Sequence, residues 1–203
     1  MAKIKLTKNE LKKQKDSLKR FNRYLPTLKL KKQQLQVEIA KVQQQTVSLK
    51  QELQSYHEKV MEWVAVFGED FCLNDILSVS GVKISEGNVA GIDIPLFKEV
   101  VFAENEYDLL STPFWVDAAL AALKTAINLI AHLKVLNDQE IILQQELQVT
   151  VQRVNLFEKV KIPQGKENIR VINIFLGDLQ TAEVVRGKLA KKKIEKKKEL
   201  QTA

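Results

Sequence analysis

The chain has 203 residues, a net charge of +7, one cysteine and seven glycines. A single cysteine excludes an intramolecular disulfide and is typical of a reducing compartment. Residues 1–16 are rich in lysine but lack the apolar segment of a targeting peptide. The most apolar window, residues 116–136, contains Asp117, Lys124 and Lys134, and a membrane span would not carry these charges. We therefore expect a soluble, cytosolic protein, unless a partner holds it at a membrane.

The charge is distributed unevenly along the chain. Residues 1–41 hold thirteen Lys or Arg and three acidic residues, and residues 186–203 hold eight and two. Residues 42–185 hold eleven basic and twenty acidic residues. Both ends are therefore basic and the middle is acidic. If the two ends lie together, one pole of the molecule is strongly positive.

A heptad pattern dominates the first third of the chain. Thr7 followed by Glu10 is typical of a capped helix start. From Leu18 onward, residues at alternating steps of three and four are apolar or aromatic, except at Lys32 and Thr46. The positions are Leu18, Phe21, Leu25, Leu28, Lys32, Leu35, Ile39, Val42, Thr46, Leu49, Leu53, Tyr56, Val60, Trp63 and Phe67. The pattern predicts a supercoiled helix about 80–90 Å long.

Two residues modify this predicted helix. Pro26 lies inside the seam, where it removes a backbone donor and crowds the preceding turn. We therefore expect a kink near residues 21–22. Beyond Pro26 the heptads continue to Phe67, and Gly68 offers a stop.

The pattern changes between Gly68 and Pro113. Residues 71–77 predict a short helix. Val79–Ser85 and Val89–Val101 are rich in Val and Ile and are separated by Glu86-Gly87-Asn88, which predicts a β-hairpin. Pro95 restricts the second strand to an edge or a bulge. An isolated hairpin is marginal in water, so we expect this one to pack on the helices or on a partner.

Helical spacing returns after Pro113 and is interrupted at Pro163 and Gly165. The apolar stripe comprises Leu120, Leu123, Ile127, Ile130, Leu133, Leu136, Leu143, Leu147, Val151 and Val154, then Ile169, Ile172, Leu176, Leu179, Ala182, Val185 and Leu189. Its changes of register mean that one uniform supercoil cannot match it.

These elements predict a mainly α fold, a long antiparallel coiled coil of the N- and C-terminal helices with a small β-hairpin module at the turn. The parts are residues 1–67 (first helix), 68–112 (hairpin and loops) and 113–203 (second helix with its basic tail), in one elongated domain. About forty-five residues join the two helices, which favours antiparallel pairing within one chain. A parallel homodimer of the first helix is the alternative.

Residue patterns that would indicate catalysis are absent from the sequence. Neither Gly165-Lys166 nor Gly187-Lys188 has the glycine spacing or the following Ser or Thr of a phosphate-binding loop. His57 and His132 have no cluster of metal ligands around them, and Cys72 is best interpreted as a small buried residue. We predict a protein that is not an enzyme and has no cofactor or metal.

The basic ends allow three interpretations. They form a solvated helix face, they bind nucleic acid phosphates, or they insert into an acidic or apolar protein socket. Residues 186–198 contain no aromatic residue for base stacking.

Residues 153–163 read RVNLFEKVKIP and resemble the RVNALEY..IP signature of the D subunit of V-type and archaeal A-type ATP synthases. Ile169-Arg170, Ile172, Leu179, Glu183 and the lysine-rich tail continue the pattern. Residues 7–11 (TKNEL) and 28–32 (LKLKK) resemble that family's opening helix. The match covers both long helices, and the helix–hairpin–helix layout agrees along the whole chain.

The resemblance implies a central-stalk rotor subunit, at the cytoplasmic face of a membrane, that couples ATP synthesis or hydrolysis to H⁺ or Na⁺ transport. It implies partners in the catalytic A and B subunits, the F subunit and the C (or d) subunit, and no nucleic acid. The alternative is a coiled-coil adaptor whose basic tip binds nucleic acid.

The resemblance also places two sets of partner-binding residues. The basic tip would enter the catalytic ring through Lys8, Lys12, Lys19, Arg20, Arg186, Lys188 and Lys191. The F-like subunit would bind the hairpin at Val82, Ile84, Val89, Ile92 and Ile94.

Overall fold

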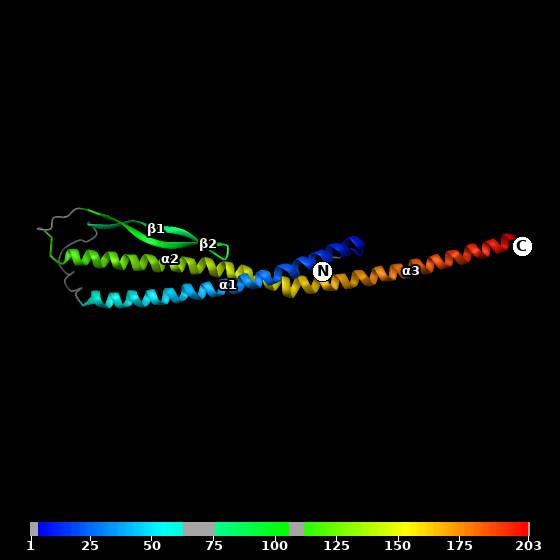
Figure 1. Ribbon diagram of the computed structural model, residues 1–203, viewed down its shortest axis with the longest axis horizontal. Coiled ribbons are helices and arrows are strands. Elements are labelled where there is room, and N and C mark those ends of the chain that lie inside the picture. Colours follow the sequence, from blue (N-terminus) through cyan, green and yellow to red (C-terminus); the bar gives the residue numbers. More distant parts are fainter. Residues whose placement is uncertain (1–3, 63–75, 106–111, 203) are drawn as a thin grey trace. The chain divides into compact units, whose positions relative to one another are not determined.

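The computed structural model describes residues 4–62, 76–105 and 112–202 (Figure 1). Along the chain these form α1 (Lys8–Met61), β1 (Leu77–Val89), β2 (Ile92–Glu104), α2 (Val116–Asn155), a π-helical segment (Leu156–Lys161) and α3 (Ile162–Thr202). The helices dominate and one antiparallel hairpin lies between them in the sequence, which confirms the predicted fold class. Ile76 is a turn residue and Leu77 begins β1, so the predicted helix 71–77 does not include its last two residues. Residues 71–75 and the predicted helix stop at 67–68 lie outside the described residues.

The chain divides into two compact units. One consists of Lys31–Thr150, and the other consists of Met1–Leu30 together with Val151–Ala203. We refer to them as the hairpin unit and the terminal unit. Each contains one stretch of α1 and one stretch of the C-terminal helical half, and each is described by itself below.

The predicted start of α1 is confirmed. The backbone N–H of Glu10 donates to Oγ1 of Thr7 at 3.3 Å, so Thr7 satisfies one of the free N–H groups at the helix start. Pro26 lies inside α1, and the helix continues past it to Met61.

The heptad seam forms the core of the hairpin unit. Its buried residues on α1 are Leu35, Ile39, Val42, Thr46 and Leu49, all of them predicted seam positions. They pack against Leu133, Leu136 and Leu143 of α2. Thr46 is tolerated in this apolar core because its hydroxyl donates to the carbonyl of Val42 at 2.9 Å, which satisfies the buried polar group.

The hairpin is confirmed, but its predicted turn is wrong. The strands pair from Leu77 with Glu104 to Val89 with Ile92, so the turn is Ala90-Gly91 and not Glu86-Gly87-Asn88. Both turn residues have positive φ, 53° and 76°, as two-residue hairpin turns with the twist of the strands require. Asn88 stabilises the turn, since its Oδ1 accepts the Gly91 N–H at 3.1 Å. Gly87 instead lies within β1, directly against the side chain of Leu96.

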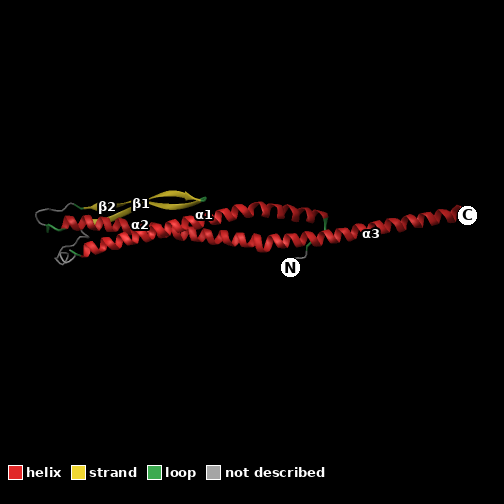
Figure 2. Cartoon of the chain, turned by 60° about the horizontal axis from the view of Figure 1, so that its bottom comes forward, coloured by secondary structure: helices red, strands yellow, loops and turns green. Residues whose placement is uncertain are grey.

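One face of α2 holds the hairpin in place (Figures 1 and 2). Oδ1 of Asn128 accepts the backbone N–H of Val100 at 3.3 Å. The ring of His132 stacks on Phe97 with centroids 4.9 Å apart, and the buried Gln139 donates to the carbonyl of Pro95. These side chains follow one another at helical spacing, so they fix the hairpin along the helix.

The terminal unit is a second antiparallel helix pair, in which the start of α1 lies along the helix that continues from α2. The rings of Phe21 and Phe157 have centroids 5.0 Å apart, and Nδ2 of Asn168 donates to Oε1 of Gln14 at 3.4 Å. Ile172 is fully buried. Phe157 contacts Phe21, and Asn168, farther along the chain, contacts Gln14, which precedes Phe21, as antiparallel pairing requires.

The predicted interruption at Pro163 and Gly165 is a local change of helix type and not a break. Residues Leu156–Lys161 are π-helical, and the backbone N–H of Ile162 donates to the carbonyl of Phe157, five residues earlier. In a regular α-helix, the Pro163 ring would press on the carbonyl four residues before it. The wider π turn directly before Pro163 relieves that clash, so the helix continues.

One helical stretch, Val116–Lys196, contains a window long and apolar enough to cross a membrane by length and composition alone. Several apolar residues of α2 in this stretch have protein partners. Leu120 packs in one core of the hairpin unit, and Leu133 and Leu136 pack in another. Packing within the hairpin unit therefore accounts for part of the apolar character of α2, while Ile130 and Ile141 are 55% and 53% exposed.

Candidate interaction surfaces

Among residues 4–62, 76–105 and 112–202, no group of three or more His, Cys, Asp or Glu side chains could hold a metal ion. His57 lines a groove between α1 and α2, and His132 stacks on Phe97. Cys72 lies outside the described residues. Three surfaces of the part of the chain that the structure describes are candidates for binding macromolecules.

The first surface is the basic end of the terminal unit. All seven predicted basic residues are exposed: Lys8, Lys12, Lys19, Arg20, Arg186, Lys188 and Lys191. They lie in two groups at different positions along the helix axis. The Gln14–Asn168 contact sets the alignment, and at about 1.5 Å per residue it places Arg186 about 18 Å beyond the level of Lys8. The N-terminal and C-terminal groups therefore do not form one compact cluster.

The C-terminal part of α3 extends beyond α1 within this unit (Figures 1 and 2). Every side chain from Glu183 to Lys196 is exposed. Several apolar residues are among them, including Val185 and Leu189 at 50% and 55% exposure. The predicted stripe therefore continues past the point where α1 can cover it, and a helix of this length without a partner is marginal in water.

The second surface is the hairpin, where the five predicted residues separate into two groups. Ile92 and Ile94 are 9% and 5% exposed, and with the partly buried Val89 they pack into the core formed by α1 and α2. Val82 and Ile84 are 40% and 52% exposed. The buried group holds the hairpin on the helices. Val82 and Ile84 pair across the strands with Val100 and Phe97, of which Val100 is buried and Phe97 stacks on His132 of α2. The two groups therefore differ in how far the helices cover them, and the exposed group is free to meet another molecule.

Two further exposed apolar residues of the hairpin were missed from the sequence. Val79 and Leu96 are 48% and 40% exposed and extend the apolar character of Val82 and Ile84. The Val and Ile content was a signal for an apolar hairpin. It could not show which of these residues the helices cover, because that depends on the twist and the bulges near residues 79–81 and 83–84.

An ion pair crosses the hairpin strands. Lys83 and Glu99 are paired across the two strands, and each side chain is 60% exposed. The hydrogen bond from Lys83, followed by the attraction of its charge, lowers the pKa of the Glu99 carboxyl below its ordinary value of 4.5. Because the pair is solvated, we expect it to add little to stability.

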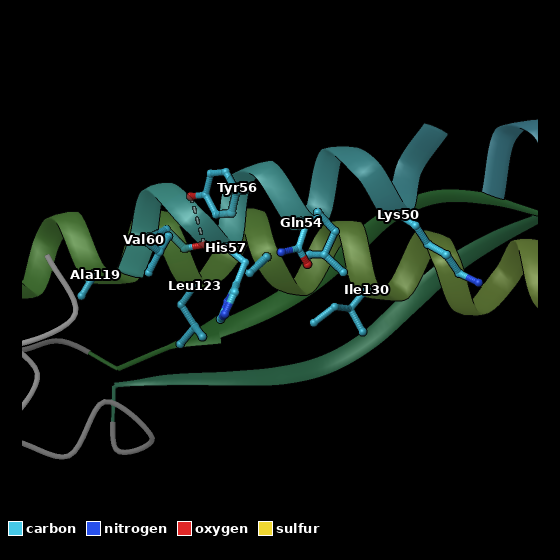
Figure 3. A pocket seen from close by; sticks show the side chains of 11 residues that line it. Lys50, Gln54, Tyr56, His57, Val60, Ala119, Leu123 and Ile130 are labelled. Carbon is cyan, nitrogen blue, oxygen red and sulfur yellow. Dashed lines mark hydrogen bonds between the residues drawn. The ribbon is translucent and has the colours of Figure 1, made fainter. Parts of the chain in front are cut away.

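The third surface is an apolar groove of about 530 Å³ between the end of α1 and the start of α2 (Figure 3). The alanines at 119, 122 and 126 leave the space that α1 does not fill. Tyr56 lies beside it, and its hydroxyl donates to the carbonyl of Ala122 at 3.3 Å. Ile130, predicted in the seam, instead lines this groove and is 55% exposed.

These features define the chain as a two-helix coiled-coil protein with a helix-bound β-hairpin and an exposed basic end. The sequence model of the ATP synthase D subunit matches residues 10–192. The chain belongs to the family of ATP synthase D subunits.

Curated relatives agree along almost the whole chain. The V-type ATP synthase D subunit of Borreliella burgdorferi is 49% identical over 197 residues, covering 97% of this chain and 98% of the relative. The protein of the same name from Chlamydia trachomatis serovar L2 is 37% identical, covering 98% and 99%. That from Chlamydia felis is 35% identical, covering 98% and 97%.

Proposed function

We propose that this chain is the central-stalk rotor subunit of a V/A-type ATP synthase or ATPase. It couples ATP synthesis or hydrolysis in the ring of catalytic A and B subunits to transport of H⁺ or Na⁺ through the membrane rotor. The proposal rests on membership of the D-subunit family. The observation that carries it furthest is the exposed, basic and partly apolar end of α3.

The end of α3 has the properties that insertion into a protein sleeve requires. It is a single helix with apolar side chains that α1 does not cover, so a surrounding partner stabilises it. Its exposed lysines and arginines are long and flexible, and each exposed ion pair contributes only ~0–1 kcal/mol. Such contacts guide the helix without locking it at one angle.

The heptad seam supports a mechanical role for the helix pairs. Torque passes along two helices only if they remain packed, and buried residues such as Leu35 and Leu143 keep them together. This chain supplies no chemical group to catalysis. It changes the relative energies of the conformations of the catalytic subunits as it turns, because its contacts with each conformation differ.

The exposed apolar side chains of the hairpin form the proposed docking site of the F-like subunit. Val79, Val82, Ile84 and Leu96 supply an apolar surface, and the outer strand edges carry backbone groups that a partner can pair with. The C (or d) subunit is the proposed partner beneath the stalk. The complex holds the chain at the cytoplasmic face of the membrane, and no nucleic acid takes part.

Reconstitution of the purified complex tests the proposal. Complexes assembled with this chain should pump ions in proportion to the ATP they hydrolyse. Complexes assembled without it should hydrolyse ATP, if at all, without pumping. Equal pumping per ATP in the two preparations would overturn the coupling role.

A further inference from the structure

The inward positions of the terminal unit change phase by one residue near Pro163. Val154 is 5% exposed, and Phe157 contacts Phe21. If the heptad pattern continued from these two residues in alternating steps of four and three, the next inward positions would be 161, 164, 168 and 171. Position 171 is a valine that is 41% exposed, whereas Ile172 is fully buried. The seam therefore arrives one residue later than the heptads before it predict.

The π-helical segment accounts for that extra residue. Its hydrogen bond from Ile162 to Phe157 spans five residues instead of four, so one turn contains an additional residue. Gly165 lies at the shifted position, where its Cα faces the side chain of Leu18. The additional residue in the π turn causes the phase change. As a result, Ile172 still faces α1.

Near the π segment, each of the two helices contains a proline and therefore lacks one backbone hydrogen-bond donor. Pro26 lacks an N–H and lies between Phe21 and Lys29, the residues that contact Phe157 and Glu158. Pro163 lacks an N–H at the end of the π segment. The π segment contains no buried residue, and Leu156 and Val160 are 43% and 48% exposed. Few buried contacts and missing hydrogen bonds mark a region of low local stability.

We infer that residues 156–163 and the Pro26 turn of α1 form a torsional joint, the level at which this helix pair twists and opens most readily. Because the π turn takes up the extra residue, the inward residues of the two helices remain paired before and after it. The joint can therefore twist without separating the helices on either side. This conclusion concerns the chain itself and does not depend on the proposed function.

Backbone hydrogen exchange on the full-length chain tests the joint. Amides of residues 158–164 should exchange about tenfold faster than those of residues 167–173, a difference of ~1.4 kcal/mol in local opening. Deleting Val160 together with Pro163→Ala removes both the extra residue and the proline. The shifted seam then returns to the heptad phase, and exchange of the remaining amides should slow to the rate of residues 167–173.

Pro163→Ala alone is the matched control. It keeps the extra residue and therefore the π turn, so exchange in the segment should remain several-fold faster than in the deletion variant. Two results would overturn the inference: wild-type exchange no faster than in residues 167–173, or equal exchange in the two variants. Loss of helical circular dichroism in the deletion variant would also contradict it, because the phase argument requires the seam to pair.

Discussion

Two aspartates in the seam of the hairpin unit provide a sharp test of how the helices are held together. Leu35 and Leu49 are 0% and 9% exposed and lie two heptads apart on α1. We expect Leu35→Asp with Leu49→Asp to separate α1 from α2. The matched control is Val37→Asp with Val47→Asp, because both valines are 55% exposed on the same helix.

The expected cost is comparable to or greater than the stability of an ordinary domain. Removing each buried leucine side chain costs ~2.7–5 kcal/mol, and leaving a carboxylate unpaired in the core adds several kcal/mol each. The pair therefore approaches or exceeds the ~5–15 kcal/mol that keeps a typical domain folded. The control changes two solvated positions, at a cost of ~0.5 kcal/mol each.

Thermal unfolding followed by circular dichroism at 222 nm measures the difference. The core variant should lose most of the helical signal of the hairpin unit at 25 °C or melt more than ~10 °C below wild type, and the control should melt within a few degrees of it. In the reconstituted complex, the core variant should fail to assemble or should hydrolyse ATP without pumping. Equal melting temperatures for the two variants, or full pumping per ATP with the core variant, would refute the reasoning.

Three further predictions address the ends, the hairpin and its ion pair. Spin labels at Gln14 and Asn168 should lie within about 20 Å, and labels at Lys12 and Lys192, offset by about 33 Å along the helix axis, should be clearly farther apart; a longer Gln14–Asn168 distance would contradict the antiparallel pair. Val82→Ser with Ile84→Ser should weaken binding of the F-like subunit about tenfold or more, measured by calorimetry, while the helical signal stays unchanged; unchanged affinity would move the site elsewhere. Lys83→Met should raise the pKa of Glu99 toward 4.5 in an NMR titration. Because pairing lowers that pKa in the folded chain, its contribution to stability is present above the ordinary carboxyl pKa and is lost as the pH falls through the lower folded value; an unchanged Glu99 titration would contradict the pairing.

Local periodicity was enough to predict the helices and most of their inward positions, although Ile130, Val185 and Leu189 are exposed. The steps of three and four from Leu35 to Leu49 identify the buried side of α1 without knowledge of its partner, because a helix has one fixed period. The capped start at Thr7 is equally local. Helical spacing in the C-terminal half also predicted Leu143 and Ile172, both fully buried.

The hairpin turn could not be located in the same way. Asn-Gly and Gly-Asn pairs are strong turn signals, so Gly87-Asn88 was the natural choice, but the packing of Ile92 and Ile94 on the helices sets a later register. Ala90 then adopts a positive φ that alanine seldom takes in isolation. Tertiary packing decided this position, and it also decided that three of the five predicted partner residues face inward.

The sequence indicated a change of register in the C-terminal half but did not predict the π-helical segment. Phe157 and Ile172 face inward but lie one residue more than two heptads apart, so no uniform heptad connects them. A stutter, a break and an extra residue within a π turn all satisfy that spacing. The five-residue hydrogen bond from Ile162 to Phe157 and the fit of Gly165 against Leu18 select among them, and both are matters of three-dimensional packing.

The central claim is that this chain rotates inside a catalytic ring. Direct observation of the rotation is the most direct test. A complex of the ring and this chain, with Cys72→Ser and Lys59→Cys, can be fixed to a surface through the ring and carry a bead on the introduced thiol. Lys59 is exposed near the end of α1 and belongs to the hairpin unit, not to the terminal unit that carries the basic end. We predict continuous rotation in one direction when ATP is added. A bead that stays still while the same complexes hydrolyse ATP at their normal rate would contradict the account.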